Sequence, residues 1–184
     1  MELIKDIKQS KIIKNVFIVL MSTILLAISS KIKIPFYPVP MTMQTLVVLV
    51  LGITLGWKLG FATITLYLFE GIIGLPVFSG SPEKGVGIVY FTGPTMGYLI
   101  GFVFAVYFAG RFKFEGSIFK NFLQLTFSVS FIYILGVLWL GTLIGWEKPL
   151  FQLGVQPFLF AELFKILIVL FSLPKLKKIT QYLR

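Results

Sequence analysis

The hydrophobic positions of this chain form long, nearly unbroken runs, unlike the alternating pattern of a half-buried strand. A helix needs ~20 mostly apolar residues to cross the hydrocarbon core of a membrane, with some tolerance for tilt. Six runs approach that length, at residues 12–30, 42–56, 59–75, 95–109, 122–145 and 157–173. Glycine and proline at the ends of the runs favour helices over a membrane barrel. The pattern predicts an all-α integral membrane bundle of six transmembrane helices, with residues 1–184 as a single membrane domain.

Composition agrees with this class. Of the 184 residues, 57% are hydrophobic, and the mean hydropathy is +0.95. Both exceed what an ordinary soluble domain carries. We therefore expect a multi-pass protein surrounded by membrane lipid.

The basic residues predict the orientation of the bundle. With a cytoplasmic N-terminus, the inner segments hold twelve of the 17 basic residues, the outer loops hold four, and Lys165 lies inside a span. The positive-inside rule then places both termini in the cytoplasm. The net charge of +10 does not indicate nucleic acid, because no basic patch is interleaved with stacking aromatic residues on a soluble surface.

Missing residue types exclude several chemistries. The chain has no cysteine and no histidine, and its only aspartate is Asp6 near the N-terminus. Disulfides, thiolate nucleophiles, histidine-based proton transfer and His/Cys metal sites are therefore excluded, and we expect no catalytic residue, metal or cofactor. The chain also lacks a "GxxxxGK[ST]" phosphate loop, so we do not expect it to hydrolyse ATP itself.

The outer connections are rich in proline, glycine and aromatic residues. They read "KIKIPFYPVP", "LPVFSGSPEKGVGIVYFTGP" and "WEKPLFQLGVQP". Such segments are tolerated at membrane depth only where protein covers them or where they line a cavity. Their clustering predicts a pocket open to the outside, although each glycine or proline can equally be a simple turn.

Glu162 and Lys165 are isolated charges in the apolar run "FLFAELFKILIVLF". Three residues apart on a helix, they lie on one face and can meet. An intramembrane charge costs ~2.5–3.5 kcal/mol on an insertion scale, so such a pair usually faces a cavity or a partner. The alternative is a self-neutralising pair in which Lys165 only supports the helix.

Two further polar residues lie within spans. Glu70 is near the outer end of the third span, where it either lines a pocket or reaches to the interface. Gln44 begins the second span and suits an amide-like ligand, or it satisfies backbone groups at the helix start.

The first helix carries small residues on one side, namely Ser22, Thr23 and Ala27. Small side chains four apart allow close helix approach. The contact is either with another helix of this chain or with a partner protein.

Four segments together resemble the biotin-specific substrate-binding (S) subunits of energy-coupling-factor transporters, the BioY family. They are "VPMTMQTLVVLVLGITLGWKLG", "LYLFEGIIGLPVFSG", "GPTMGYLIGF" and "PFLFAELFK". The order, the spacing and the length match as well, so the resemblance covers nearly the whole chain.

The resemblance implies a six-helix subunit in the plasma membrane of a prokaryote that captures biotin from outside with high affinity. Its implied partners are a transmembrane coupling subunit and two cytoplasmic ATPases, and its implied coupling face is on the first helix. The family's acidic-x-x-Lys motif implies that Glu162 and Lys165 bind the ligand. By the same resemblance Phe78, Ser79, Thr95 and Tyr98 wall the fused ring. Gln44 and Glu70 are further candidates because of their places within the spans.

The sequence departs from the family pattern in three places. The acidic position, commonly aspartate, is Glu162; the outer loop reads "SGSPEKG"; and Met96 replaces a glycine. These departures leave room for a biotin-like ligand such as dethiobiotin or lipoate. An alternative from another functional class is an intramembrane enzyme acting on lipid or acyl groups, which would use Glu70 or Glu162 as a general base. A third reading is an assembly subunit with no ligand.

Overall fold

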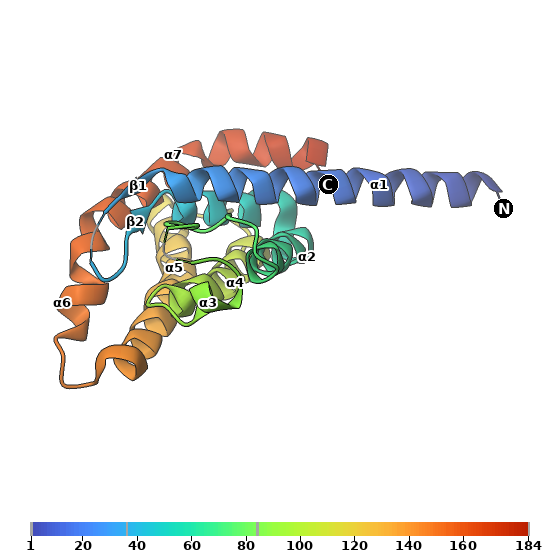
Figure 1. The fold of residues 1–184 in the computed structure, drawn as a ribbon. Helices are drawn as coiled ribbons and strands as arrows, with labels where there is room; N and C mark the ends of the chain where they lie inside the picture. Colours follow the sequence, from blue (N-terminus) through green and yellow to red (C-terminus); the bar gives the residue numbers. More distant parts are fainter. Residues whose placement is uncertain (1, 36, 84, 184) are drawn as a thin grey trace.

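The computed structural model describes residues 2–35, 37–83 and 85–183. In chain order the long helices are α1 (Glu2–Lys31), α2 (Gln44–Ile72), α4 (Met96–Arg111), α5 (Ile118–Ile144) and α7 (Leu159–Leu183). Shorter elements join them: strands β1 (Lys33–Ile34) and β2 (Met41–Thr42), helices α3 (Ile88–Phe91) and α6 (Leu150–Gly154), and the 3-10 turn η1 (Gln156–Phe158). Figure 1 shows the helices packed as one bundle, which confirms the all-helical prediction.

Four helical stretches of the described chain are long and apolar enough to cross a membrane, namely Ser10–Lys31, Gln44–Ile72, Ile118–Ile144 and Leu150–Leu183, and α4 is a shorter apolar helix. Their outer surfaces are apolar. Phe160, Phe164 and Phe171 on α7 are 71–85% exposed. Exposed aromatic side chains on this scale fit a surface that lipid covers, since soluble proteins rarely expose large contiguous apolar patches.

α2 covers both the second and the third predicted span. Gly56 interrupts it with non-helical backbone angles, φ 76° and ψ 172°. A positive φ is readily adopted only by glycine, so the chain turns here between two helical halves. With α1, the two halves of α2, α4, α5 and α7, the count of six helices agrees with the sequence prediction.

α4 packs closely against α2 on one side and α5 on the other, through glycines. A Cβ atom at Gly52 of α2 would lie 2.8 Å from the Ala109 Cβ of α4. On the opposite side, a Cβ at Gly101 would lie 2.5 Å from the Ile132 Cα of α5. Small residues thus bring the helix backbones close, as expected for packing within a membrane.

The C-terminal end of α7 lies close to the middle of α1 (Figure 1). The Lys14 ammonium donates to the Tyr182 carbonyl at 3.0 Å, which joins α1 to the last turn of α7. The first half of α1 and the C-terminal end of α7 therefore lie at the same end of the bundle, while the exposure of that end to the cytoplasm stays a prediction. α7 continues to Leu183, past the predicted end of its span at residue 173.

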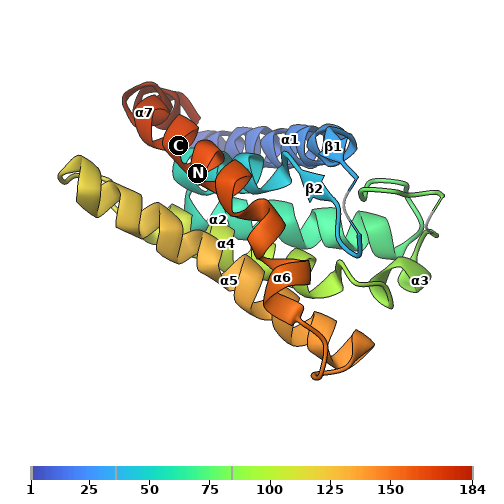
Figure 2. The ribbon, with the colours of Figure 1, turned by 90° about the vertical axis from the view of Figure 1, so that its left-hand side faces the viewer.

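The opposite end of the bundle carries the short elements. β1 and β2 pair antiparallel, with Lys33 opposite Thr42 and Ile34 opposite Met41. This hairpin leads into the first turn of α2. The loop between α2 and α4, with α3 in it, lies at this end as well (Figure 2).

Candidate functional site

A cavity lies where the start of α2, the start of α4, the middle of α5 and the start of α7 meet. The empty space at this place, open solvent at its mouth included, is about 520 Å³. Its lining is Val39, Pro40, Met41, Thr42, Gln44, Thr45, Ser79, Tyr90, Thr95, Tyr98, Leu99, Phe102, Ile132, Tyr133, Phe158, Glu162 and Lys165.

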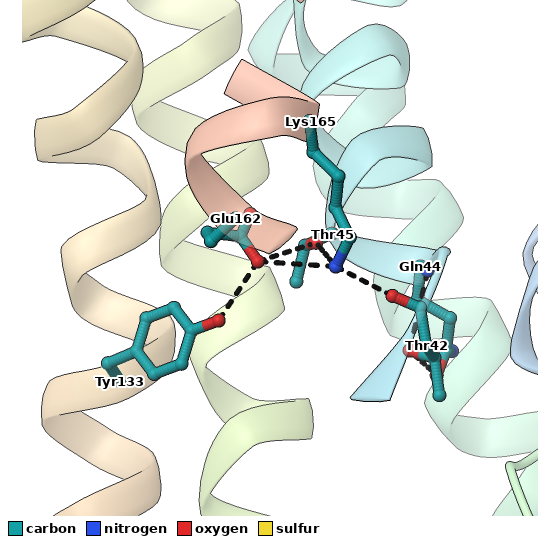
Figure 3. Close-up of polar contacts among 6 residues, drawn as sticks. All are labelled: Thr42, Gln44, Thr45, Tyr133, Glu162 and Lys165. Carbon is teal, nitrogen blue, oxygen red and sulfur yellow. Dashed lines mark hydrogen bonds and ion pairs between the residues drawn. The ribbon is translucent and has the colours of Figure 1, made fainter. Parts of the chain in front are cut away.

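Lys165 reaches from α7 to the start of α2 and is almost completely buried. Its ammonium donates to the Thr42 carbonyl at 2.7 Å, to Thr45 Oγ1 at 2.9 Å and to Glu162 Oε2 at 3.3 Å. An ammonium has three N–H donors, so these contacts use all of them. Figure 3 shows the side chain spanning the two helices.

The Glu162 carboxylate is bonded through one oxygen only. Its Oε2 accepts hydrogen bonds from Thr45 at 3.0 Å, from Tyr133 at 2.9 Å and from Lys165. Tyr133 approaches from α5, opposite Lys165 and Thr45 (Figure 3). The second oxygen, Oε1, is buried and has no hydrogen-bond partner among the described residues. A buried carboxylate oxygen without a donor is costly, and this one belongs to a residue on the cavity wall.

Gln44 is also buried on the cavity wall. Its Nε2 donates to the Tyr67 hydroxyl at 2.8 Å, and its Oε1 accepts from Thr42 Oγ1 at 3.3 Å. A side-chain amide has two N–H donors and two acceptor lone pairs. These contacts therefore fix the amide and still leave it one N–H and one lone pair.

Ser79, Thr95 and Tyr98 come to the cavity from the α2–α4 connection and the start of α4. Ser79 Oγ is buried and has no partner in the described part of the chain. Tyr98 donates to the Gly154 carbonyl at 2.9 Å and so joins α4 to α6. Thr95 precedes the first turn of α4. Of the eight ligand-binding residues predicted from sequence, six therefore line one cavity.

The other two, Glu70 and Phe78, do not line it. Glu70 Oε1 accepts a hydrogen bond from Thr23 at 2.9 Å, so this carboxylate joins α2 to α1. The Phe78 ring is 1% exposed, stacks on Tyr90 with centroids 4.9 Å apart, and fills the space above Gly71, where a Cβ atom would overlap it. Both positions are explained by packing within the bundle.

The small residues of α1 also contact the chain itself. Thr23 is 2% exposed and bonds Glu70, as above, while the Ser22 hydroxyl donates to the Ile18 carbonyl at 2.7 Å. Ala27 is half-buried and packs against the hydrophobic core. Ser22 additionally borders an apolar groove between α1, α2 and α7.

Sequence reasoning did not single out Thr45, Tyr133 or Tyr90. Thr45 follows Gln44 directly, and Tyr133 is the only tyrosine of its span. Each is a polar residue in an apolar run, which is the only sequence feature that could have marked it as a site residue. Tyr90 donates to the Ser79 carbonyl, and burial raises the pKa of its phenol above the ordinary value. It therefore stays a hydrogen-bond donor at neutral pH.

Comparison with known proteins bears on this arrangement. The sequence pattern described as "BioY family" matches residues 4–182. The chain belongs to the BioY family. A relative from Pyrococcus horikoshii, named probable biotin transporter BioY, is 36% identical over 152 residues, which cover 83% of this chain and 89% of the relative.

Two further similarities span most of the chain. The biotin transporter BioY of Thermotoga maritima is 32% identical over 158 residues, covering 85% of this chain and 92% of its own. The crystal structure of the S-component for biotin from an ECF-type ABC transporter superposes with a TM-score of 0.77 at 25% identity, covering 95% of this chain and 98% of that one. Both the sequence and the fold of this chain are thus those of a BioY-type membrane protein.

Proposed function

We propose that this protein is the substrate-binding subunit of an ECF-type transporter and captures biotin from outside the cell for uptake. The observation that carries the proposal is the Glu162 carboxylate on the cavity wall, with Oε2 held by three donors and Oε1 buried without a hydrogen-bond partner among the described residues. Family membership and relatives named biotin transporters support biotin as the ligand.

The chemistry of biotin suits this wall. Its fused ring system carries two ureido N–H donors and one carbonyl. A charged acceptor makes shorter and stronger hydrogen bonds than a neutral one, so Glu162 Oε1 would accept from a ureido N–H. The ring would pack against the apolar side chains of Leu99, Phe102 and Ile132, which line the same cavity.

Lys165 would act on the ligand through Glu162. Its three donors are taken up by Thr42, Thr45 and Glu162, so it has none left for an acceptor of the ligand. We infer that Lys165 holds the carboxylate in place and neutralises its charge. The longer glutamate at the position where relatives commonly have aspartate would set how deep Oε1 reaches into the cavity.

Uptake would depend on partner proteins. The sequence has no phosphate loop, so ATP would be hydrolysed by two cytoplasmic ATPases and the energy passed on by a transmembrane coupling subunit. The location would be the plasma membrane of a prokaryote, with both termini in the cytoplasm. Ser22, Thr23 and Ala27 mark the proposed coupling face on α1.

The ligand alternatives differ in the group that meets Glu162. Dethiobiotin keeps the cyclic urea and lacks the thioether, whereas lipoate has no ureido N–H at all. If Glu162 Oε1 selects the ligand, biotin and dethiobiotin bind and lipoate does not. An intramembrane enzyme, the alternative from another class, is disfavoured because the family's named members are transporters.

Calorimetric titration of the detergent-purified protein with biotin, dethiobiotin and lipoate tests the proposal. Saturable binding of biotin with no heat from lipoate is the expected result. Absence of biotin binding by folded protein would overturn the function, and equal affinity for lipoate would overturn the assigned role of Glu162.

A further inference from the structure

The segment of residues 77–81, "VFSGS", brings Ser79 to the cavity, and side chains from other elements hold its backbone. The Val77 carbonyl accepts from the Ser30 hydroxyl at 2.8 Å and from the Tyr67 hydroxyl at 2.9 Å. The Ser79 carbonyl accepts from Tyr90. These side chains satisfy backbone carbonyls that no helix or strand pairs, and so hold the segment against its neighbours.

Lys31, the last residue of α1, makes the charged contacts with this segment. Its ammonium donates to the Phe78 carbonyl and to the Ser81 carbonyl, each at 2.8 Å, and approaches Ser81 Oγ at 3.4 Å. Bonds from an ionised donor are about twice as strong as neutral ones. Together with Ser30, Lys31 therefore binds the end of α1 to three carbonyls of the 77–81 segment.

The Phe78 ring fixes the opposite face of the segment. It lies between Tyr67, at a centroid distance of 5.3 Å, and Tyr90, at 4.9 Å. With the ring anchored there and the carbonyls held by α1, the next residue turns to the cavity. Ser79 Oγ arrives there buried and, within the described residues, without a partner.

We propose that Lys31 is a positioning residue of the ligand site: by tying the end of α1 to the 77–81 segment, it makes ligand affinity depend on the position of α1. The ligand part of this inference rests on the proposed function. Such coupling is reciprocal. A partner that displaces α1 would lower the affinity for the ligand, and bound ligand would lower the affinity for that partner by the same factor.

Lys31→Met tests the inference, with Lys33→Met as its matched control. Both remove one ammonium from an exposed lysine, at the end of α1 or two residues beyond it in β1, but Lys33 has no hydrogen bond from its side chain to the described residues. Lys31→Arg is the conservative variant, because it keeps the charge and the donors. The first readout needs no ligand: spin labels on Glu83→Cys and Trp146→Cys, in the cysteine-free chain, report the position of the loop.

Lys31→Met should broaden the distribution of distances between the labels, and Lys33→Met and Lys31→Arg should leave it as in the wild type. An unchanged distribution in Lys31→Met would overturn the inference, and so would equal broadening in Lys33→Met. The distance measurement needs no ligand, so it tests the role of Lys31 even if the wild type does not bind biotin. Failure to bind biotin would contradict the proposed function and not this inference.

The second readout is biotin affinity, measured by calorimetry on the same variants. Lys31→Met should weaken binding severalfold, up to the roughly tenfold that the loss of one hydrogen bond from a charged group amounts to, and Lys33→Met should not. A broadened distance distribution with unchanged affinity would show that the segment does not position the ligand site, and would overturn that part of the inference.

Discussion

Glu162 and Lys165 meet through a single oxygen: the ammonium lies 3.3 Å from Oε2, while Oε1 has no partner in the described chain. If their purpose were mutual neutralisation alone, both oxygens would be expected to find donors, since buried polar atoms rarely go unpaired. The one-sided arrangement instead leaves a buried acceptor oxygen on a residue that lines the cavity. It favours a pair built for a ligand.

Replacing Glu162 by glutamine should weaken biotin binding. The amide keeps the shape of the side chain but loses the charge, and hydrogen bonds to charged groups contribute about 1.5–3 kcal/mol. Calorimetry on the folded variant measures the change. Glu147→Gln, the same replacement at an exposed residue of the α5–α6 connection, should bind as the wild type does, and equal affinity of the two variants would refute the assignment.

Removing Lys165 should destabilise the fold as well as the site. Lys165→Met leaves the Glu162 charge buried without its counter-ion, and breaking a buried pair from one side costs about 3–5 kcal/mol. The thermal unfolding midpoint in detergent should fall, whereas Lys175→Met, at an exposed position of the same helix, should leave it unchanged.

The double variant Glu162→Gln, Lys165→Met separates charge from packing. With no unpaired charge left, it should unfold at a higher temperature than Lys165→Met alone. A double variant less stable than the single one would mean that Lys165 acts by filling space and not by pairing.

The orientation of the bundle can be tested with single cysteines, because the chain has none of its own. Glu83→Cys, in the exposed α2–α3 loop, should react with an impermeant thiol reagent in intact cells. Lys113→Cys, exposed between α4 and α5, should react only after the membrane is opened. The opposite pattern of labelling would invert the predicted topology.

The helices were predictable because their signal is local: apolar length, and glycine or proline at the ends. The break at Gly56 follows from the same signal, since a glycine-rich connection separates two apolar runs. The pairing of Glu162 with Lys165 was predictable from helical spacing. Their contacts with Thr45 and Tyr133 join residues 117 and 29 positions away from Glu162, and no local pattern encodes which helices become neighbours.

Phe78 and Glu70 illustrate the same limit. In the sequence, Phe78 stands next to Ser79 and is expected to pack against the ring of the ligand. In the structure its side chain fills the space above Gly71 instead of lining the cavity. Glu70 looks like a second ligand carboxylate until the fold brings Thr23 within 2.9 Å of it. In both cases the competing partner lies on a segment that local patterns cannot place.

The last prediction concerns energy coupling through α1. Ala27→Trp adds bulk at a half-buried position of the proposed coupling face, whereas Ile28→Trp adds the same ring at the next residue, where the native side chain is 56% exposed. If a partner helix packs closely against the small residues, the Ala27→Trp variant should bind biotin nearly as the wild type does. It should lose ATP-dependent uptake with the reconstituted partners. The Ile28→Trp variant should keep both biotin binding and uptake. Thermal unfolding identifies a misfolded variant, which would lose both activities. Normal uptake by a folded Ala27→Trp variant would show that the small residues of α1 serve packing within the bundle, as the bond between Thr23 and Glu70 does, and that partners contact another face.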